Sequence, residues 1–152
     1  MKILASNKKA YFNFDILESF ESGIVLNGSE VKSVKEGRIS LAGSYIKIKN
    51  SEMFLLNTKI PQYKFSAIRL TEAEESRERK LLMHKKQIAN LDTKLKQSGT
   101  TLVPLEVFTN DKSLIKVTVS LVKGRKKFDK RAKLKEKDMK RGVENDRKRY
   151  RI

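Results

Sequence analysis

The last thirty residues limit what this chain can fold into. Residues 123–152 hold 15 Lys or Arg against 5 Asp or Glu, so they carry +10 of the chain's net charge of +17. The few apolar side chains among them cannot offset the entropy of ordering such a segment. We therefore expect a basic tail over 123–152 that is disordered when the protein is free. The folded domain is then residues 1–122, which is enough chain to build one hydrophobic core.

The charge of the tail indicates the kind of partner. A basic segment that binds phosphates releases condensed counterions, so concentrated positive charge favours nucleic acid. A membrane partner is not expected, because no apolar run approaches the roughly 18 residues that a spanning helix needs. The first residues are too polar for a signal peptide, and the absence of Cys excludes a disulfide framework. We expect a soluble, cytoplasmic protein that is monomeric when free.

Apolar and polar residues alternate in most of the domain, which is typical of half-buried strands. Many short strands with few helices predict a mainly β fold, a closed or nearly closed antiparallel barrel with one short and one longer helix. The short helix has Ser29 as a plausible N-cap and Gly37 at the left-handed position after its end. Pro104 limits its strand to an edge position or a bulge, because proline cannot donate a backbone hydrogen bond to a neighbouring strand. Residues 61–78 are predicted to be a long loop. Strands are predicted over 10–17, 22–27, 45–50, 53–56, 101–108 and 115–121, and the longer helix over 85–98.

Signals of catalysis are scarce. His84 is the only histidine, which excludes a His pair for a metal, and we expect it to be a cap or a surface residue. The acidic side chains near 72–78 lie among Arg and Lys in a polar stretch, where a solvated face is the simpler interpretation. No glycine-rich phosphate-binding motif is present. We expect no enzymatic activity, no cofactor and no metal.

Signals of RNA binding are better, although each one alone is also typical of a solvated surface. Basic side chains are interleaved with aromatic residues that fall out of phase with the apolar positions, so that their rings can stack on bases. Together they favour an RNA-binding domain. The residues concerned are Lys8, Lys9, Lys32, Lys35, Arg38, Lys116, Tyr11 and Tyr45.

The tail has a second property. At about 100° per residue, Phe128, Ala132, Met139 and Val143 fall within about 60° of one another on a helical wheel. This seam predicts a helix over 128–141 that is too polar to persist alone and forms when the tail binds. The alternative is an arm that follows RNA without secondary structure.

Six segments, read in order, resemble the SsrA-binding protein family, also called small protein B. The resemblance covers essentially the whole chain with the correct spacing. Two motifs occur together in this chain, Gly-x-Glu-Val-Lys-Ser and Lys-Gly-x-Lys-x-x-Asp-Lys-Arg. Their combination is highly specific for this family. The segments are Asn7–Ala10, Phe20–Gly23, Gly28–Ser33 continuing to Gly37, Ser44-Tyr45, Arg79–Lys85 and Val122–Arg131.

The resemblance implies an OB-like barrel and a non-enzymatic role in trans-translation. Such a protein binds the transfer-RNA-like domain of transfer-messenger RNA (tmRNA, SsrA) and delivers it to stalled ribosomes for rescue and nascent-peptide tagging. Its tail occupies the empty mRNA channel and the decoding centre, near 16S rRNA. A general ribosomal protein that binds rRNA, or a barrel-fold nuclease, remains the alternative.

The resemblance also implies site residues. Phe128 stands where many family members have His, and its ring can still stack on a base. The RNA-contacting residues implied are Asn7, Lys8, Glu21, Leu82 and Lys116. The tail residues implied for the ribosome are Lys123, Gly124, Phe128, Asp129, Lys130 and Arg131.

Overall fold

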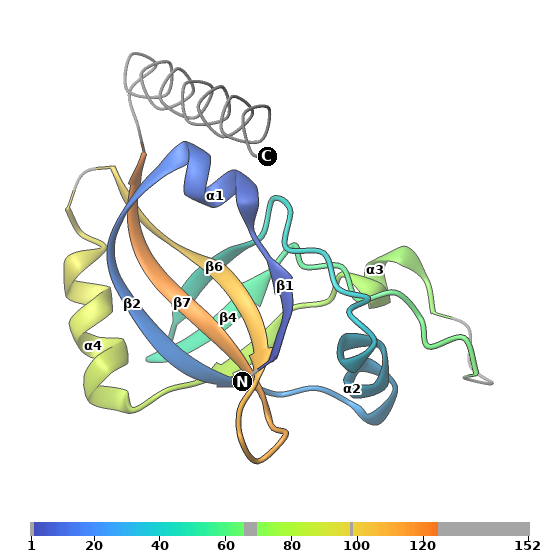
Figure 1. Cartoon of the computed structure of the whole chain (residues 1–152). Helices are drawn as coiled ribbons and strands as arrows, with labels where there is room; N and C mark the ends of the chain where they lie inside the picture. The colour runs from blue at the N-terminus through green and yellow to red at the C-terminus, as the bar shows by residue number, and fades with distance from the viewer. Residues whose placement is uncertain (1, 66–69, 98, 125–152) are drawn as a thin grey trace, which may run out of the picture.

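The computed structural model of this protein describes residues 2–65, 70–97 and 99–124 (Figure 1). The expectations for a free, disordered tail and for a tail helix on the ribosome lie outside these residues. So do the positions of Phe128, Asp129, Lys130 and Arg131.

The described residues form one antiparallel sheet of seven strands, in the order β1-β6-β3-β4-β5-β2-β7. The sheet closes because β6 also pairs with β7, which confirms the predicted mainly β, barrel-like fold. The strands are β1 (Lys2–Ser6), β2 (Phe14–Ile24), β3 (Tyr45–Lys49), β4 (Glu52–Leu56), β5 (Arg79–Leu82), β6 (Thr100–Thr109) and β7 (Ile115–Gly124). The helices are α1 (Lys8–Asn13), α2 (Gly28–Lys35), α3 (Glu72–Glu75) and α4 (Lys85–Lys94).

The core is built from the inward-facing positions of the strands. On β7, Val117, Val119 and Leu121 are buried, as their spacing of two predicts. The amphipathic helix α4 adds Ile88 and Leu91 to the same cluster. The predicted hairpin of β3 and β4 is confirmed, with pairing from Tyr45 to Leu56 through Lys49 to Glu52.

The start of the chain differs from the prediction. Residues 2–6 form the unpredicted strand β1 and residues 8–13 form helix α1. The strands predicted over 10–17 and 22–27 are one strand, β2, which begins only at Phe14 and ends at Ile24. The cause is Asn7, whose Oδ1 accepts a hydrogen bond from the Ala10 amide at 3.2 Å. Its Nδ2 donates to the Pro104 carbonyl at 2.9 Å, across 97 residues of sequence. This tertiary contact begins a helix where the local apolar spacing predicted a strand.

The number of helices was also underestimated. The segment 61–78 contains the short α3, and β5 was missed because its Arg79 and Lys80 hide the apolar pattern. Helix α4 ends at Lys94, four residues earlier than predicted. Pro104 lies at a register shift of the β6–β7 ladder, so the bulge alternative holds. The edge alternative does not, since β6 pairs with strands on both sides.

Helix α2 begins and ends through local hydrogen bonds. Its N-cap is Asn27, two residues before the predicted Ser29, and Asn27 forms a capping box with Glu30. Gly37 lies after the helix with φ +78°, in the left-handed conformation that was predicted for it.

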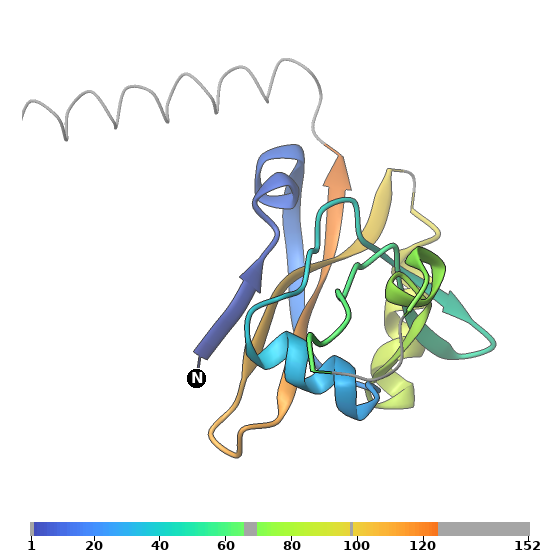
Figure 2. The same ribbon diagram turned by 90° about the vertical axis from the view of Figure 1, so that its right-hand side faces the viewer.

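Strand β7 continues through Lys123 and Gly124, two residues beyond the predicted domain boundary. Lys123 pairs with Asp15 and Gly124 with Phe14 of β2. Both views place the end of β7 beside α1, at one end of the barrel (Figure 1, Figure 2). The turn between β6 and β7 lies at the opposite end.

Candidate nucleic-acid interface

Three of the five residues implied for RNA contact lie on one surface. Glu21, Leu82 and Lys116 come from β2, β5 and β7 and line the same pocket, of about 380 Å³. They meet there because β2 lies between the other two strands. At Gly23, β2 pairs with Leu82 on one side and with Lys116 on the other.

Gly23 allows this close approach. A Cβ atom at Gly23 would lie 3.3 Å from the Cβ of Leu82, closer than side-chain contacts normally come. Leu82 is packed against the backbone here, yet its side chain remains 51% exposed at the pocket. Glu21 lies two residues before Gly23 on the same face of β2, so Glu21 and Leu82 line one pocket.

The pocket combines groups of complementary hydrogen-bonding type. Glu21 opposes Thr118 and Gly23 opposes Lys116, so Glu21 and Lys116 are diagonal neighbours on one face of the sheet. Within the described residues, the Glu21 carboxylate has no ion-pair partner and is exposed to solvent. It is free to accept hydrogen bonds from base amino groups or ribose hydroxyls, which a surface of Lys and Arg cannot do. His84 and Gln87 complete the rim.

The other two residues lie elsewhere, at the α1 end of the barrel. Asn7 is buried, and both ends of its amide are engaged by Ala10 and Pro104. Its geometry is that of a structural cap. Lys8 is exposed as the first residue of α1.

The α1 end carries its own concave surface. A pocket of about 400 Å³ runs from α1 to the start of β3. Tyr45 lines it with 45% of its side chain exposed, so its ring is available for stacking. Tyr11 is less free, because its hydroxyl donates to Glu106 Oε1 at 3.1 Å. Burial, followed by this carboxylate, raises the pKa of Tyr11.

The sequence analysis missed a buried ion pair. Glu30 is 4% exposed and Arg79 is fully buried. Arg79 Nε donates to Glu30 Oε2 at 2.7 Å, while its Nη1 and Nη2 donate to the carbonyls of Thr58 and Glu75 at 2.7 and 2.8 Å. Arg77 contacts the other oxygen of Glu30. The pair ties α2 to β5, to the loop after β4 and to α3.

This ion pair joins two of the six segments that carry the family resemblance. Glu30 belongs to the Gly28–Ser33 segment and Arg79 to the Arg79–Lys85 segment. The spacing of Asn27 and Glu30 matches a capping box, so the role of Glu30 at the start of α2 could have been predicted from the sequence. No local pattern could pair Glu30 with an Arg 49 residues later.

The ion pair predicts a pH dependence of stability. Burial alone would raise the pKa of Glu30, but hydrogen bonds from Arg77, the Asn27 amide and Arg79 outweigh it and lower the pKa below the ordinary value of 4.5. The ionised group therefore adds stability above pH 4.5, and this stability is lost as pH falls through the folded-state pKa. We expect Glu30→Gln to lose about 3 kcal/mol of unfolding free energy at neutral pH, measured by urea denaturation.

The difference between wild type and Glu30→Gln should shrink as pH falls below 4.5, because protonation makes the two alike. The control is Glu52→Gln, which breaks an exposed pair with Lys80 at 3.1 Å and should cost less than about 1 kcal/mol. A difference for Glu30→Gln that stays constant from pH 7 to pH 3 would contradict the assigned pKa direction.

The described residues also bear on other kinds of site, through their side chains and helices. They contain no group of three or more His, Asp or Glu side chains arranged to hold a metal ion. Within the same ranges, no helix has the length and apolar character needed to cross a membrane. His84 is exposed at the start of α4 and makes no side-chain capping bond.

Comparison with known proteins gives a consistent result. The SmpB protein family model matches residues 4–149. The chain is 43% identical to the SsrA-binding protein of Thermosipho africanus strain TCF52B over 143 residues, which cover 94% of this chain and 95% of that protein. It is 48% identical to the SsrA-binding protein of Sulfurihydrogenibium sp. strain YO3AOP1 over 144 residues, or 94% and 92% of the two chains.

A solved structure is similar as well. Its description reads "tmRNA-SmpB: a journey to the center of the bacterial ribosome". The superposition has a TM-score of 0.67 at 36% sequence identity and covers 81% of this chain and 85% of the other.

Proposed function

Because this chain belongs to the SmpB family of SsrA-binding proteins, we propose that it binds the transfer-RNA-like domain of tmRNA and delivers it to stalled ribosomes. The relatives are named for binding SsrA, and the description of the similar structure names tmRNA, SmpB and the bacterial ribosome. The protein acts in trans-translation as a cytoplasmic RNA-binding adaptor and has no catalytic step of its own.

The convergence of Glu21, Leu82 and Lys116 is the observation that carries this proposal. Lys116 supplies a cation for a phosphate, and the charge-assisted bond is stronger than a neutral one. Glu21 accepts hydrogen bonds from bases or 2′-hydroxyls, which gives selectivity for RNA. Leu82 supplies an apolar contact, on the opposite side of Gly23 from Lys116. A surface with both an acceptor and a donor recognises particular nucleotides, whereas a uniformly basic surface binds any polyanion.

The α1 end serves the ribosome in this proposal. Gly124 ends β7 opposite Phe14, the residue that follows α1, so the tail begins at the α1 end of the barrel. Lys123, Gly124 and the tail residues Phe128, Asp129, Lys130 and Arg131 contact 16S rRNA in the decoding centre and the mRNA channel. That channel is lined by phosphates, and a basic tail can enter it when message is absent. Asn7 contributes indirectly, by holding the start of α1.

A competition assay tests the proposal. The full-length protein should bind the transfer-RNA-like domain of tmRNA more tightly than elongator transfer RNA or a 16S rRNA fragment at the same salt concentration. Equal affinity for all three RNAs would replace the proposal with a general rRNA-binding protein. Cleavage of the RNA in the presence of Mg²⁺ would instead indicate a nuclease.

Glu21 provides a sharper test of the recognition surface. We expect Glu21→Lys to weaken binding to the transfer-RNA-like domain by about tenfold or more, since it removes a charged acceptor from hydrogen bonds. Affinity for unrelated duplex RNA should rise slightly, because the variant gains positive charge. Both affinities are measured by gel shift or filter binding.

The matched control is Glu74→Lys, which adds the same charge at an exposed residue of α3 outside the pocket. It should bind both RNAs at least as well as wild type. If Glu21→Lys behaves like Glu74→Lys while remaining folded, Glu21 does not recognise RNA.

A further inference from the structure

The turn that leads from β2 into α2 contains the only Asn-Gly pair of this chain, Asn27-Gly28. An Asn-Gly pair is especially prone to deamidation, because glycine has no side chain to shield its backbone nitrogen. In this reaction the Gly28 nitrogen bonds to Cγ of Asn27, and the side-chain nitrogen takes up the Gly28 amide proton and leaves as ammonia. Water then opens the resulting five-membered imide at either carbonyl group. The products at position 27 are aspartate and isoaspartate.

Burial does not protect this pair from reaction. Asn27 and Gly28 are both exposed to solvent. A Cβ atom built on Gly28 would meet no heavy atom of the described residues within 4 Å. Water and hydroxide therefore reach the pair, and packing does not require glycine at this position.

Hydrogen bonds hold Asn27 in a conformation that does not lead to the imide. Its Oδ1 accepts a hydrogen bond from the Glu30 amide at 2.9 Å, and its own amide donates to Glu30 Oε1 at 3.0 Å. Its carbonyl accepts a hydrogen bond from the Val31 amide at 3.0 Å. The extended ψ of 171° keeps the Gly28 nitrogen out of the plane that the imide ring requires. Asn27 must therefore leave the cap before it can react.

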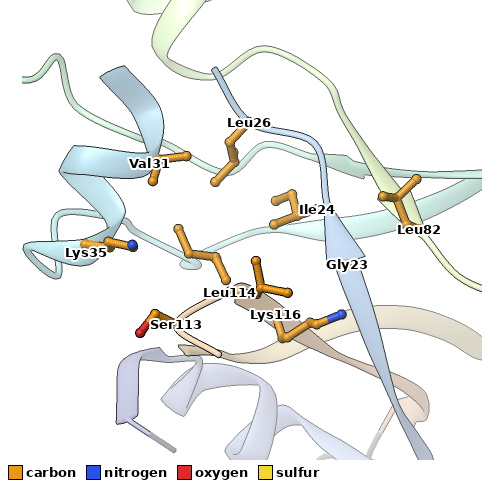
Figure 3. A pocket seen from close by; sticks show the side chains of 10 residues that line it. Gly23, Ile24, Leu26, Val31, Lys35, Leu82, Ser113, Leu114 and Lys116 are labelled. Atoms are coloured by element: carbon orange, nitrogen blue, oxygen red, sulfur yellow. The ribbon is translucent and has the colours of Figure 1, made fainter. Parts of the chain in front are cut away.

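Two apolar side chains support the same conformation. Leu26 precedes the cap and Val31 follows it by four residues, which is the spacing of a hydrophobic staple. Both line a pocket of about 340 Å³ between the end of β2, α2 and the β6–β7 turn. Figure 3 shows the two side chains directed into this hollow. Leu26 also packs against the main core cluster, so the path of the chain into α2 is fixed.

Glu30 connects the cap to the interior of the protein. The carboxylate that accepts a hydrogen bond from the Asn27 amide also pairs with the buried Arg79. Arg79 therefore keeps this carboxylate in the position that the cap requires. While the ion pair is intact, the start of α2 opens rarely, and Asn27 stays in its unreactive conformation.

We propose that Asn27 is a deamidation site whose reaction is controlled by the capping box of α2 and, through Glu30, by the buried ion pair. In the folded protein Asn27 reacts only from a locally opened state. The aspartate product keeps an acceptor at the cap, and its charge is favourable at the start of a helix. The isoaspartate product adds a methylene group to the main chain and cannot re-form the capping box. This inference is independent of the RNA-binding function.

Peptide mapping by mass spectrometry tests the proposal on the full-length protein, aged at mildly alkaline pH. An isoaspartyl methyltransferase reaction separates isoaspartate from aspartate. We expect Asn27 to deamidate at least about tenfold more slowly in the native protein than in urea, because only the opened cap reacts. Gly28→Ala should slow the reaction in urea by about tenfold or more, since a methyl group then shields the nitrogen.

Glu30→Gln tests the control by the ion pair. It should raise the rate of Asn27 deamidation in the native protein by about tenfold and leave the rate in urea unchanged. Glu52→Gln, which breaks the exposed pair with Lys80, should change neither rate. Leu91→Ala is the control for global stability, because Leu91 is fully buried on α4, which Figure 1 shows well apart from α2. At a similar loss of stability, Leu91→Ala should accelerate the reaction less than Glu30→Gln does.

The outcomes separate a local cap from other causes. Equal rates for Asn27 in native and unfolded protein would overturn the proposal, because the cap would then give no protection. Equal acceleration by Leu91→Ala and Glu30→Gln would show that global unfolding controls the reaction. An unchanged native rate in Glu30→Gln would remove the ion pair from the mechanism. If Gly28→Ala reacts in urea as fast as wild type does, Asn27-Gly28 is not a reactive pair.

Discussion

An Arg79→Ala variant should lose about 3–5 kcal/mol of unfolding free energy, which is a large part of the stability of a domain of this size. Arg79 is fully buried, and its guanidinium donates to Glu30 and to the carbonyls of Thr58 and Glu75. Removing it leaves a buried carboxylate without its main partner and takes a donor from the Thr58 and Glu75 carbonyls, of which Glu75 still accepts from the Ile60 amide. Urea denaturation measures the loss, and an unchanged m-value would show that the transition remains two-state.

Arg77→Ala is the matched control. Arg77 contacts the same carboxylate, but its side chain is 39% exposed, so water can replace it. We expect a loss of about 1 kcal/mol or less. Equal losses for the two variants would mean that burial of Arg79 contributes nothing and that the network is only a surface salt bridge.

Removing the tail should separate RNA binding from ribosome rescue. We expect the chain cut after Gly124 to keep its preference for tmRNA over elongator transfer RNA, because the Glu21 pocket lies wholly within the barrel. Tagging of nascent chains on stalled ribosomes should be lost, since the cut removes most of the segment that carries +10 of the charge. The measurements are competitive RNA binding and a translation assay with a message that lacks a stop codon.

Two controls refine this experiment. A cut after Val122 should also reduce stability, because it removes two residues that pair with β2. A full-length chain with residues 125–152 scrambled retains the charge but not the order of residues. If the scrambled tail supports normal tagging, charge alone suffices, and the predicted apolar seam has no role. If the chain cut after Gly124 loses RNA binding outright, the division into an RNA-binding barrel and a ribosome-binding tail is wrong.

Local sequence patterns were sufficient for the class of fold and for most of its strands. The alternation at Val117, Val119 and Leu121 predicted β7, and the amphipathic spacing of Ile88 and Leu91 predicted α4. Gly37 was assigned its left-handed conformation correctly. These features follow from interactions within a few residues, namely side-chain period and backbone freedom, and such interactions can be read along the chain. Charge along the chain likewise indicated a nucleic-acid partner.

Tertiary structure alone decided the features that depend on distant residues. Helix α1 exists because Asn7 contacts Pro104, and β5 was hidden because its Arg79 is paired inside the core. Glu21, Leu82 and Lys116 were named one by one through a family resemblance, but only the pairing of β2 with β5 and β7 shows that they share a pocket. A binding surface is a property of side-chain positions in space, which local patterns along the chain do not give.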